Sequence, residues 1–215
     1  MSIDFWGGLR NALGAWHEVQ LHALGAIIPD VDEADITVVG NGIGHDTLEL
    51  EKFLYNGIDP GNSQQDFVNN VLTKAGDRPI RTLTIDNHGD SGLQIISMGK
   101  DGAPDDSLYI TPGSVDFQQW QRLRGHFAKD GMIQLMGCRV ASGEQGPLLL
   151  QELAEITGVP VSGSVTITAP LLGKHGTMVT AYPDGHFVID KSASDAEMDT
   201  FGGEEPGPGL SPDLK

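Results

Sequence analysis

The sequence of 215 residues contains a single cysteine, Cys138, and few basic residues. One cysteine cannot form a disulfide within the chain or supply a multi-thiolate zinc site, so both are excluded. Lysine and arginine total 13 against 30 aspartate and glutamate residues, which gives a formal net charge of −17. Such a chain repels nucleic-acid phosphates and anionic membrane surfaces, so we expect neither as a partner.

The sequence also lacks a long apolar run and a signal peptide. No run of apolar residues approaches the roughly 20 that span a bilayer. The first residues have no basic start, apolar centre and small-residue cleavage site. We therefore expect a soluble, cytoplasmic protein without a membrane span, or one exported by a route that needs no cleaved signal peptide. We expect no cofactor and no bound metal.

What the chain does have is the composition of a globular protein with many turns. Hydrophobic residues make up 39% of it, and glycine accounts for 29 residues. Three parts are predicted: an N-terminal helical extension at 1–30, an α/β domain at 31–191, and an acidic tail at 192–215. The tail is rich in Ser, Asp, Glu, Gly and Pro, which is typical of disorder.

Predicted strands alternate with predicted helices through the central part of the chain. Strands are expected at 35–40, 80–86, 93–97, 131–137 and 159–168, and helices near 46–55, 63–75, 114–128 and 146–157. Ser63 is a suitable N-cap for the second helix. The alternation predicts a three-layer α/β sandwich, with a mainly parallel sheet and helices on both faces. Residues 176–190 predict a C-terminal hairpin that turns at 183–185.

Two residues suited to nucleophilic chemistry follow predicted strands. His88 comes soon after the strand 80–86, and Cys138 directly after the strand 131–137. Ligands bind beyond the carboxyl ends of parallel strands, so neighbouring strands would bring both side chains to one rim. A cysteine attacks as its thiolate, and a nearby imidazole takes or balances the proton. Gly89 leaves room for a substrate, and its N–H suits a developing oxyanion.

The local sequences around these two residues resemble a known group of peptidases. Residues 83–89 read Leu-Thr-Ile-Asp-Asn-His-Gly, residues 133–138 read Ile-Gln-Leu-Met-Gly-Cys, and His88 and Cys138 are 50 positions apart. They are similar to the caspase-type fold shared by caspases, metacaspases, clostripain-like and gingipain-like enzymes. The context at 137–143 is similar to the caspase-like domains of large bacterial surface and secreted proteins. The resemblance covers roughly residues 34–170.

The resemblance implies a caspase-like sheet within 31–191 and a cysteine endopeptidase that acts on proteins or peptides. It implies Cys138 as the nucleophile, His88 as the acid and base, and an oxyanion hole formed by the N–H groups of Gly89 and Cys138. Four further residues are candidates for lining the cleft: Asp86, Asp90, Met136 and Arg139. A regulatory or immunity-type protein is a second kind of partner that this interpretation allows.

Substrate preference stays open, because Met136 stands where caspases carry a glutamine and metacaspases an aspartate. Three alternatives also stay open. Asp86, His88 and Asp90, joined by His45-Asp46, are potential ligands of a metal-dependent hydrolase, although the two aspartates also suit a turn. A caspase-like fold kept only for binding is the second alternative. The glycine-rich turn 40–44 favours a nucleotide site only weakly, since it lacks the fingerprint spacing and a lysine.

Overall fold

The computed structural model describes residues 33–40, 52, 56–97, 108–169, 174–193, 195–199, 208–209 and 211–214. The chain divides into two compact units, Met1–Glu33 and Ala34–Lys215. Except for Glu33, every described residue belongs to the second unit. The predicted extension at 1–30, His45-Asp46 and, apart from Lys52, the helix near 46–55 lie outside the described residues. No helix within the described ranges is long and apolar enough to cross a membrane.

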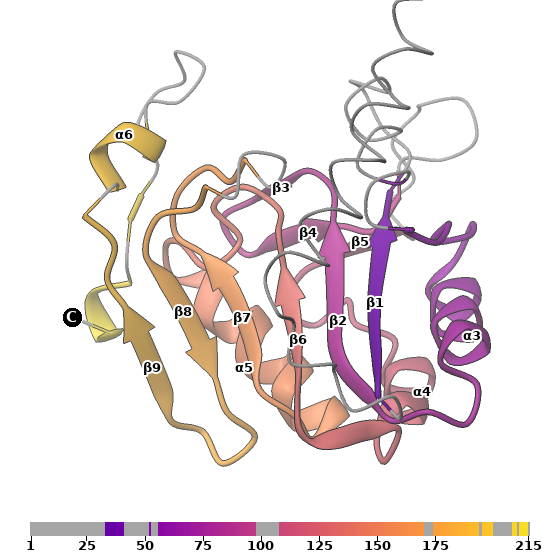
Figure 1. The fold of residues 1–215 in the computed structure, drawn as a ribbon. Helices are drawn as coiled ribbons and strands as arrows, with labels where there is room; N and C mark the ends of the chain where they lie inside the picture. Colours follow the sequence, from indigo (N-terminus) through magenta and orange to yellow (C-terminus); the bar gives the residue numbers. More distant parts are fainter. Residues whose placement is uncertain are drawn as a thin grey trace, which may run out of the picture. The chain divides into compact units, whose positions relative to one another are not determined.

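Six strands form one mixed sheet in the order β1-β2-β6-β7-β8-β9 (Figure 1). Their bounds are β1 Ala34–Val39, β2 Ile80–Asp86, β6 Phe127–Leu135, β7 Val161–Ser164, β8 Met178–Ala181 and β9 Phe187–Asp190. The first four strands pair in parallel, and the last two are antiparallel. The prediction of an α/β fold with a mainly parallel sheet is therefore confirmed, as is the C-terminal hairpin, which β8 and β9 form.

The central strands of this sheet are apolar because they are covered by other parts of the molecule. Leu83 and Ile85 of β2, and Ile133 and Leu135 of β6, are fully buried. Their neighbours on either side in the sheet include Val38 and Val161, which are also fully buried. Branched apolar side chains suit such strands, since they pack well on a pleated surface.

The described helical segments connect these strands. They are α3 (Gln64–Ala75), α4 (Phe117–Trp120), α5 (Gln145–Thr157) and α6 (Asp195–Asp199), with 3₁₀ turns η2 (Gln121–Leu123) and η5 (Pro212–Leu214). Helix α3 lies against β1 and α4, and α5 lies against α4, β7 and β8. Figure 1 shows α4 and α5 behind the sheet. Helix α4 contacts both α3 and α5, so these described helices form one layer.

Local signals in the sequence set the ends of two helices correctly. The Ser63 hydroxyl accepts the Asp66 N–H at 3.0 Å, so the predicted N-cap of α3 is confirmed. Helix α5 ends at Gly158, which adopts a left-handed φ of +77° that favours glycine. Both helices therefore begin and end within two residues of the predicted positions.

The helix predicted at 114–128 is wrong in length. Helix α4 has only four residues, the turn η2 follows it, and β6 already begins at Phe127. Gly125, at a φ of +85°, turns the chain after η2. The His126 carbonyl then accepts the Ile80 N–H at 2.7 Å, which draws the following residues into the ladder with β2. Trp120 and Leu123 still face the core, as their apolar spacing indicates.

A small second sheet follows β2 directly. It contains β3 (Gly89–Asp90), β4 (Leu93–Ile95) and β5 (Tyr109–Ile110), all antiparallel. The short strand predicted at 93–97 corresponds to β4, which contacts α5. The hairpin β3–β4 therefore begins at the residue after His88.

Parts of the predicted acidic tail contact the domain. The Asp195 carboxylate of α6 accepts the Thr177 N–H at 2.5 Å and the Thr177 hydroxyl at 2.6 Å. Met198 is fully buried. The Gly209 carbonyl accepts the Gly143 N–H at 2.7 Å. These contacts differ from the disorder predicted for the whole of 192–215, because composition alone does not reveal one buried methionine and one well-placed carboxylate.

We expect Met198→Ala to lower the melting temperature if α6 packs as described. Removing a buried methionine side chain costs about 2–5 kcal/mol, and each kcal/mol is worth roughly 2–4 °C in a domain of this size. The melting temperature should therefore fall by at least about 4 °C in a thermal scan. Glu197→Ala is the matched control, because Glu197 is exposed on the same helix. Equal, small effects of both substitutions would favour the disordered tail.

Candidate active site

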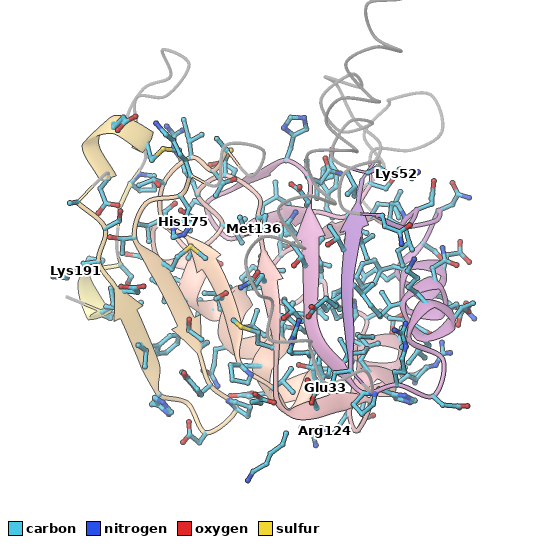
Figure 2. The ribbon with its side chains drawn as sticks, in the orientation of Figure 1. Glu33, Lys52, Arg124, Met136, His175 and Lys191 are labelled. Atoms are coloured by element: carbon cyan, nitrogen blue, oxygen red, sulfur yellow. The ribbon has the colours of Figure 1, made fainter. Side chains whose placement is uncertain are left out.

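Strands β2 and β6 bring His88 and Cys138 to the same edge of the sheet. The two strands are parallel neighbours. One further bond continues the ladder, from the Met136 N–H to the Ile85 carbonyl at 2.9 Å. Figure 2 shows Met136 at the carboxyl end of the parallel strands, while Arg124 lies at the opposite end. The predicted rim at the carboxyl end of β2 and β6 is therefore present.

Two segments meet at this rim, residues 88–95 and residues 136–143, which we name the His hairpin and the Cys loop. The Gly92 N–H donates to the Val140 carbonyl at 3.0 Å. The Ser91 hydroxyl donates to the Ser142 carbonyl at 2.7 Å. The tip of the His hairpin is thus bonded to the second half of the Cys loop.

The backbones of the His hairpin and the Cys loop also touch at two glycines. A Cβ atom on Gly89 would lie 2.9 Å from the Gly137 Cα and 2.7 Å from a Val140 methyl group. A Cβ atom on Gly137 would lie 2.9 Å from the Gly89 Cα. No side chain fits at either position without a shift of the backbone. The residue after His88 therefore lies directly against the residue before Cys138.

Cys138 is half-buried, and Thr168 lies beside its sulfur. The Cys138 Sγ is 4.0 Å from both the carbonyl oxygen and the hydroxyl oxygen of Thr168. The Thr168 hydroxyl also donates to the Met136 carbonyl at 2.5 Å. Thr168 thus contacts the Cys loop on both sides of Gly137 and helps to fix the position of the thiol.

Arg139 turns the chain immediately after the thiol. Its φ of +58° is unusual for a residue other than glycine, and its N–H donates to the Thr166 carbonyl at 2.8 Å. Backbone conformations of this kind cost about 1–3 kcal/mol and cluster at functional sites. The sharp turn comes just after Cys138, beyond the end of β6, and Val140 and Ala141 then lie in the core.

The other predicted site residues have distinct surroundings. His88 is exposed, and its backbone N–H donates to the side-chain oxygen of Asn87 at 2.8 Å. Asp86, the last residue of β2, is buried. Asp90 is exposed, and its carboxylate accepts the Ser91 N–H at 2.8 Å, which is a turn-forming role.

No cluster of three or more His, Cys, Asp or Glu side chains within the described ranges is placed to hold a metal ion. The ligand set of the metal-hydrolase alternative included Asp86, His88 and Asp90, all of which are described. The positions of these three side chains therefore give that alternative no support.

Sequence reasoning missed Gln94 and Thr168. Gln94 is fully buried in β4. Its carbonyl oxygen accepts the Gly137 N–H at 2.9 Å, and its amide nitrogen donates to the carbonyls of Ile95 at 2.8 Å and His88 at 3.4 Å. The only signal in the sequence was a glutamine between two apolar residues of a short strand. For Thr168 there was none, because its role depends on the approach of two distant segments.

The chain belongs to the family described as Domain of unknown function (DUF4347), whose model matches residues 51–174, more than half of the chain. The matched range includes the His hairpin, the Cys loop and Thr168. No curated protein and no solved structure matches the chain. The family description supplies no activity.

We expect Gly89→Ala to destabilise the protein and to disturb the rim. The added methyl group would overlap Val140 and Gly137, and overpacking of this kind costs about 1–3 kcal/mol. Gly163→Ala in β7 is the matched control, because its Cβ would meet its nearest neighbour at an ordinary 3.4 Å. Thermal scans should show a lower melting temperature for the first variant and little change for the second. Equal melting temperatures would contradict the close contact of the two glycines.

Proposed function

We propose that this chain is a caspase-like cysteine endopeptidase, with Cys138 as the nucleophile and His88 as the general acid and base. The observation that carries the proposal is the backbone contact between Gly89 and Gly137 at the ends of β2 and β6. It places the histidine and cysteine segments together, as thiol catalysis requires. The caspase-like three-layer sandwich belongs to the same proposal. The parallel order β1-β2-β6-β7 supports its sheet, and the helical layer on the second face stays a prediction.

The surroundings of Cys138 support a thiol that is oriented by Thr168 and activated by His88. The Thr168 hydroxyl has one proton, and it donates this proton in the hydrogen bond to the Met136 carbonyl at 2.5 Å. Only the lone pairs of that hydroxyl are then left for the sulfur at 4.0 Å. Thr168 therefore orients the thiol without stabilising a thiolate. The imidazole of His88 is the group that would stabilise the Cys138 thiolate.

The ladder of the His hairpin supports Gly89 as an oxyanion donor. The Ile95 N–H donates to the His88 carbonyl at 3.0 Å, so residues 88 and 95 form a hydrogen-bonded pair. Antiparallel pairs alternate, so Gly89 and Gln94 form a non-hydrogen-bonded pair whose N–H groups point away from the partner strand. We assign this outward Gly89 N–H to the oxyanion hole, with the Cys138 N–H as the second donor.

The reaction is acyl transfer in two steps. The Cys138 sulfur bonds to the scissile carbonyl carbon, and His88 takes the thiol proton and delivers it to the leaving amine. Water then attacks the resulting thioester, with His88 taking the proton of the water and returning it to the sulfur. The products are an amine and a carboxylic acid, and the free thiol is regenerated.

The substrate is a protein or peptide. Met136 carries no charge, so the position two residues before the nucleophile supplies no electrostatic selection of an acidic or basic side chain. The residue preference is best measured directly, with a peptide library in which the residue before the cut site is varied.

The proposal predicts that Cys138→Ala abolishes peptide cleavage. His88→Ala should lower kcat/KM by about 10²–10⁴-fold, the usual contribution of a general acid or base. His126→Ala is the matched control, because His126 is exposed and lies just before β6, at the opposite end of the sheet. Cys138 should also react with iodoacetamide at neutral pH faster than a model thiol, and His88→Ala should slow this reaction.

Two results would contradict the peptidase. If the wild-type chain cleaves no peptide and Cys138 is alkylated only after unfolding, the cysteine is structural and the binding module is favoured. Cleavage that survives Cys138→Ala but is lost in a chelator would favour the metal-dependent hydrolase.

A further inference from the structure

We propose that Gln94 is the positioning residue that keeps His88 and Cys138 in register. The proposal rests on the cysteine-peptidase function. Gln94 joins two peptide groups that belong to the site. Its amide nitrogen donates to the carbonyl of His88 itself at 3.4 Å, and its carbonyl oxygen accepts the N–H of Gly137, the neighbour of Cys138, at 2.9 Å.

Gln94 lies between two sets of hydrogen bonds that join the segments after β2 and β6. The last ladder bond between the two strands joins Met136 to Ile85, so the segments beyond it are no longer held by the main sheet. The bonds from Ser91 and Gly92 connect the far end of the His hairpin to the Cys loop. Between these points, the side chain of Gln94 links the backbone at residue 88 to the backbone at residue 137.

The chemistry of the side chain explains why a glutamine is present. Gln94 is fully buried, and a buried amide is stable only when both of its ends are paired. Its second donor bond, to the Ile95 carbonyl at 2.8 Å, completes the pairing and fixes the amide plane. An uncharged side chain with a donor and an acceptor at one end meets both needs, while a carboxylate would face two carbonyl oxygens.

The test uses Gln94→Met and Gln94→Glu in the full chain. Methionine keeps the length of the side chain but loses both hydrogen bonds. Glutamate keeps the acceptor for the Gly137 N–H and loses the donor to His88. We expect Gln94→Met to lower kcat by about 10–100-fold with little change in KM, since small misplacements of reacting groups act on the chemical step. The probe is the peptide that the wild-type chain cleaves best in the library.

Two further measurements do not depend on peptide cleavage. In Gln94→Met, the alkylation rate of Cys138 by iodoacetamide at neutral pH should fall toward that of His88→Ala, and its midpoint against pH should rise. Amide hydrogen exchange at Gly137 should accelerate in Gln94→Met more than in Gln94→Glu, which retains the acceptor.

Gln64→Met is the matched control. Gln64 is a half-buried glutamine that also bridges two segments, since its amide donates to the Ser114 carbonyl at 3.1 Å and accepts from the Asp116 N–H at 2.9 Å and the Trp120 indole N–H at 2.8 Å. It should lower the melting temperature as Gln94→Met does, but leave kcat and the alkylation profile unchanged.

The outcomes separate the two proposals. If Gln94→Met lowers the melting temperature but leaves kcat and the alkylation profile at their wild-type values, Gln94 is merely structural and the inference is overturned. If the wild-type chain cleaves no peptide, the proposed function fails by itself, and the iodoacetamide profile still decides whether Gln94 couples His88 to Cys138.

Discussion

The contact between Gly89 and Gly137 is the constraint on which the rim depends. Neighbouring strands of a sheet lie about 4.8 Å apart, and the twist of the sheet tends to separate the segments that leave their ends. Here the segments that leave β2 and β6 remain in contact because neither has a side chain at the point where they meet. The buried side chain of Val140 packs against both glycines on the core side of this contact.

The Cys loop is also held from its other side. The Arg139 N–H donates to the Thr166 carbonyl at 2.8 Å, and the Ala141 N–H donates to the Ser164 carbonyl at 2.9 Å. The loop therefore lies between the His hairpin and the chain that leaves β7, with bonds to both. A side chain on such a loop has little freedom to move. The proposed nucleophile would then be held in place before substrate arrives, which lowers the cost of reaching the transition state.

The sequence predicted the strands and their role in the site better than the connections between them. Buried apolar runs ended by His88 and by Cys138 predicted that both would reach one rim, and Ser63 predicted the start of α3. The apolar spacing around Trp120 predicts one long helix, which is wrong because periodicity does not reveal that the chain pairs with β2 from Phe127 onward.

The two supporting residues of the site, Thr168 and Gln94, could not be predicted from the sequence for a related reason. Thr168 and Gln94 act on atoms that lie 30 and 43 positions away in the chain. Such contacts depend on the completed fold, and the local secondary-structure propensity of the sequence does not indicate them. Met198 is a similar case, since the composition of an acidic segment does not show which of its few apolar residues is buried.

The single cysteine has a consequence for redox chemistry. A thiol oxidised to sulfenic acid is commonly rescued by condensation with a second thiol, and further oxidation to sulfinic acid is in general irreversible. These 215 residues contain no second thiol, so an oxidised Cys138 has no resolving partner within them. Its recovery from peroxide then depends on a small-molecule reductant or on a thiol of another chain.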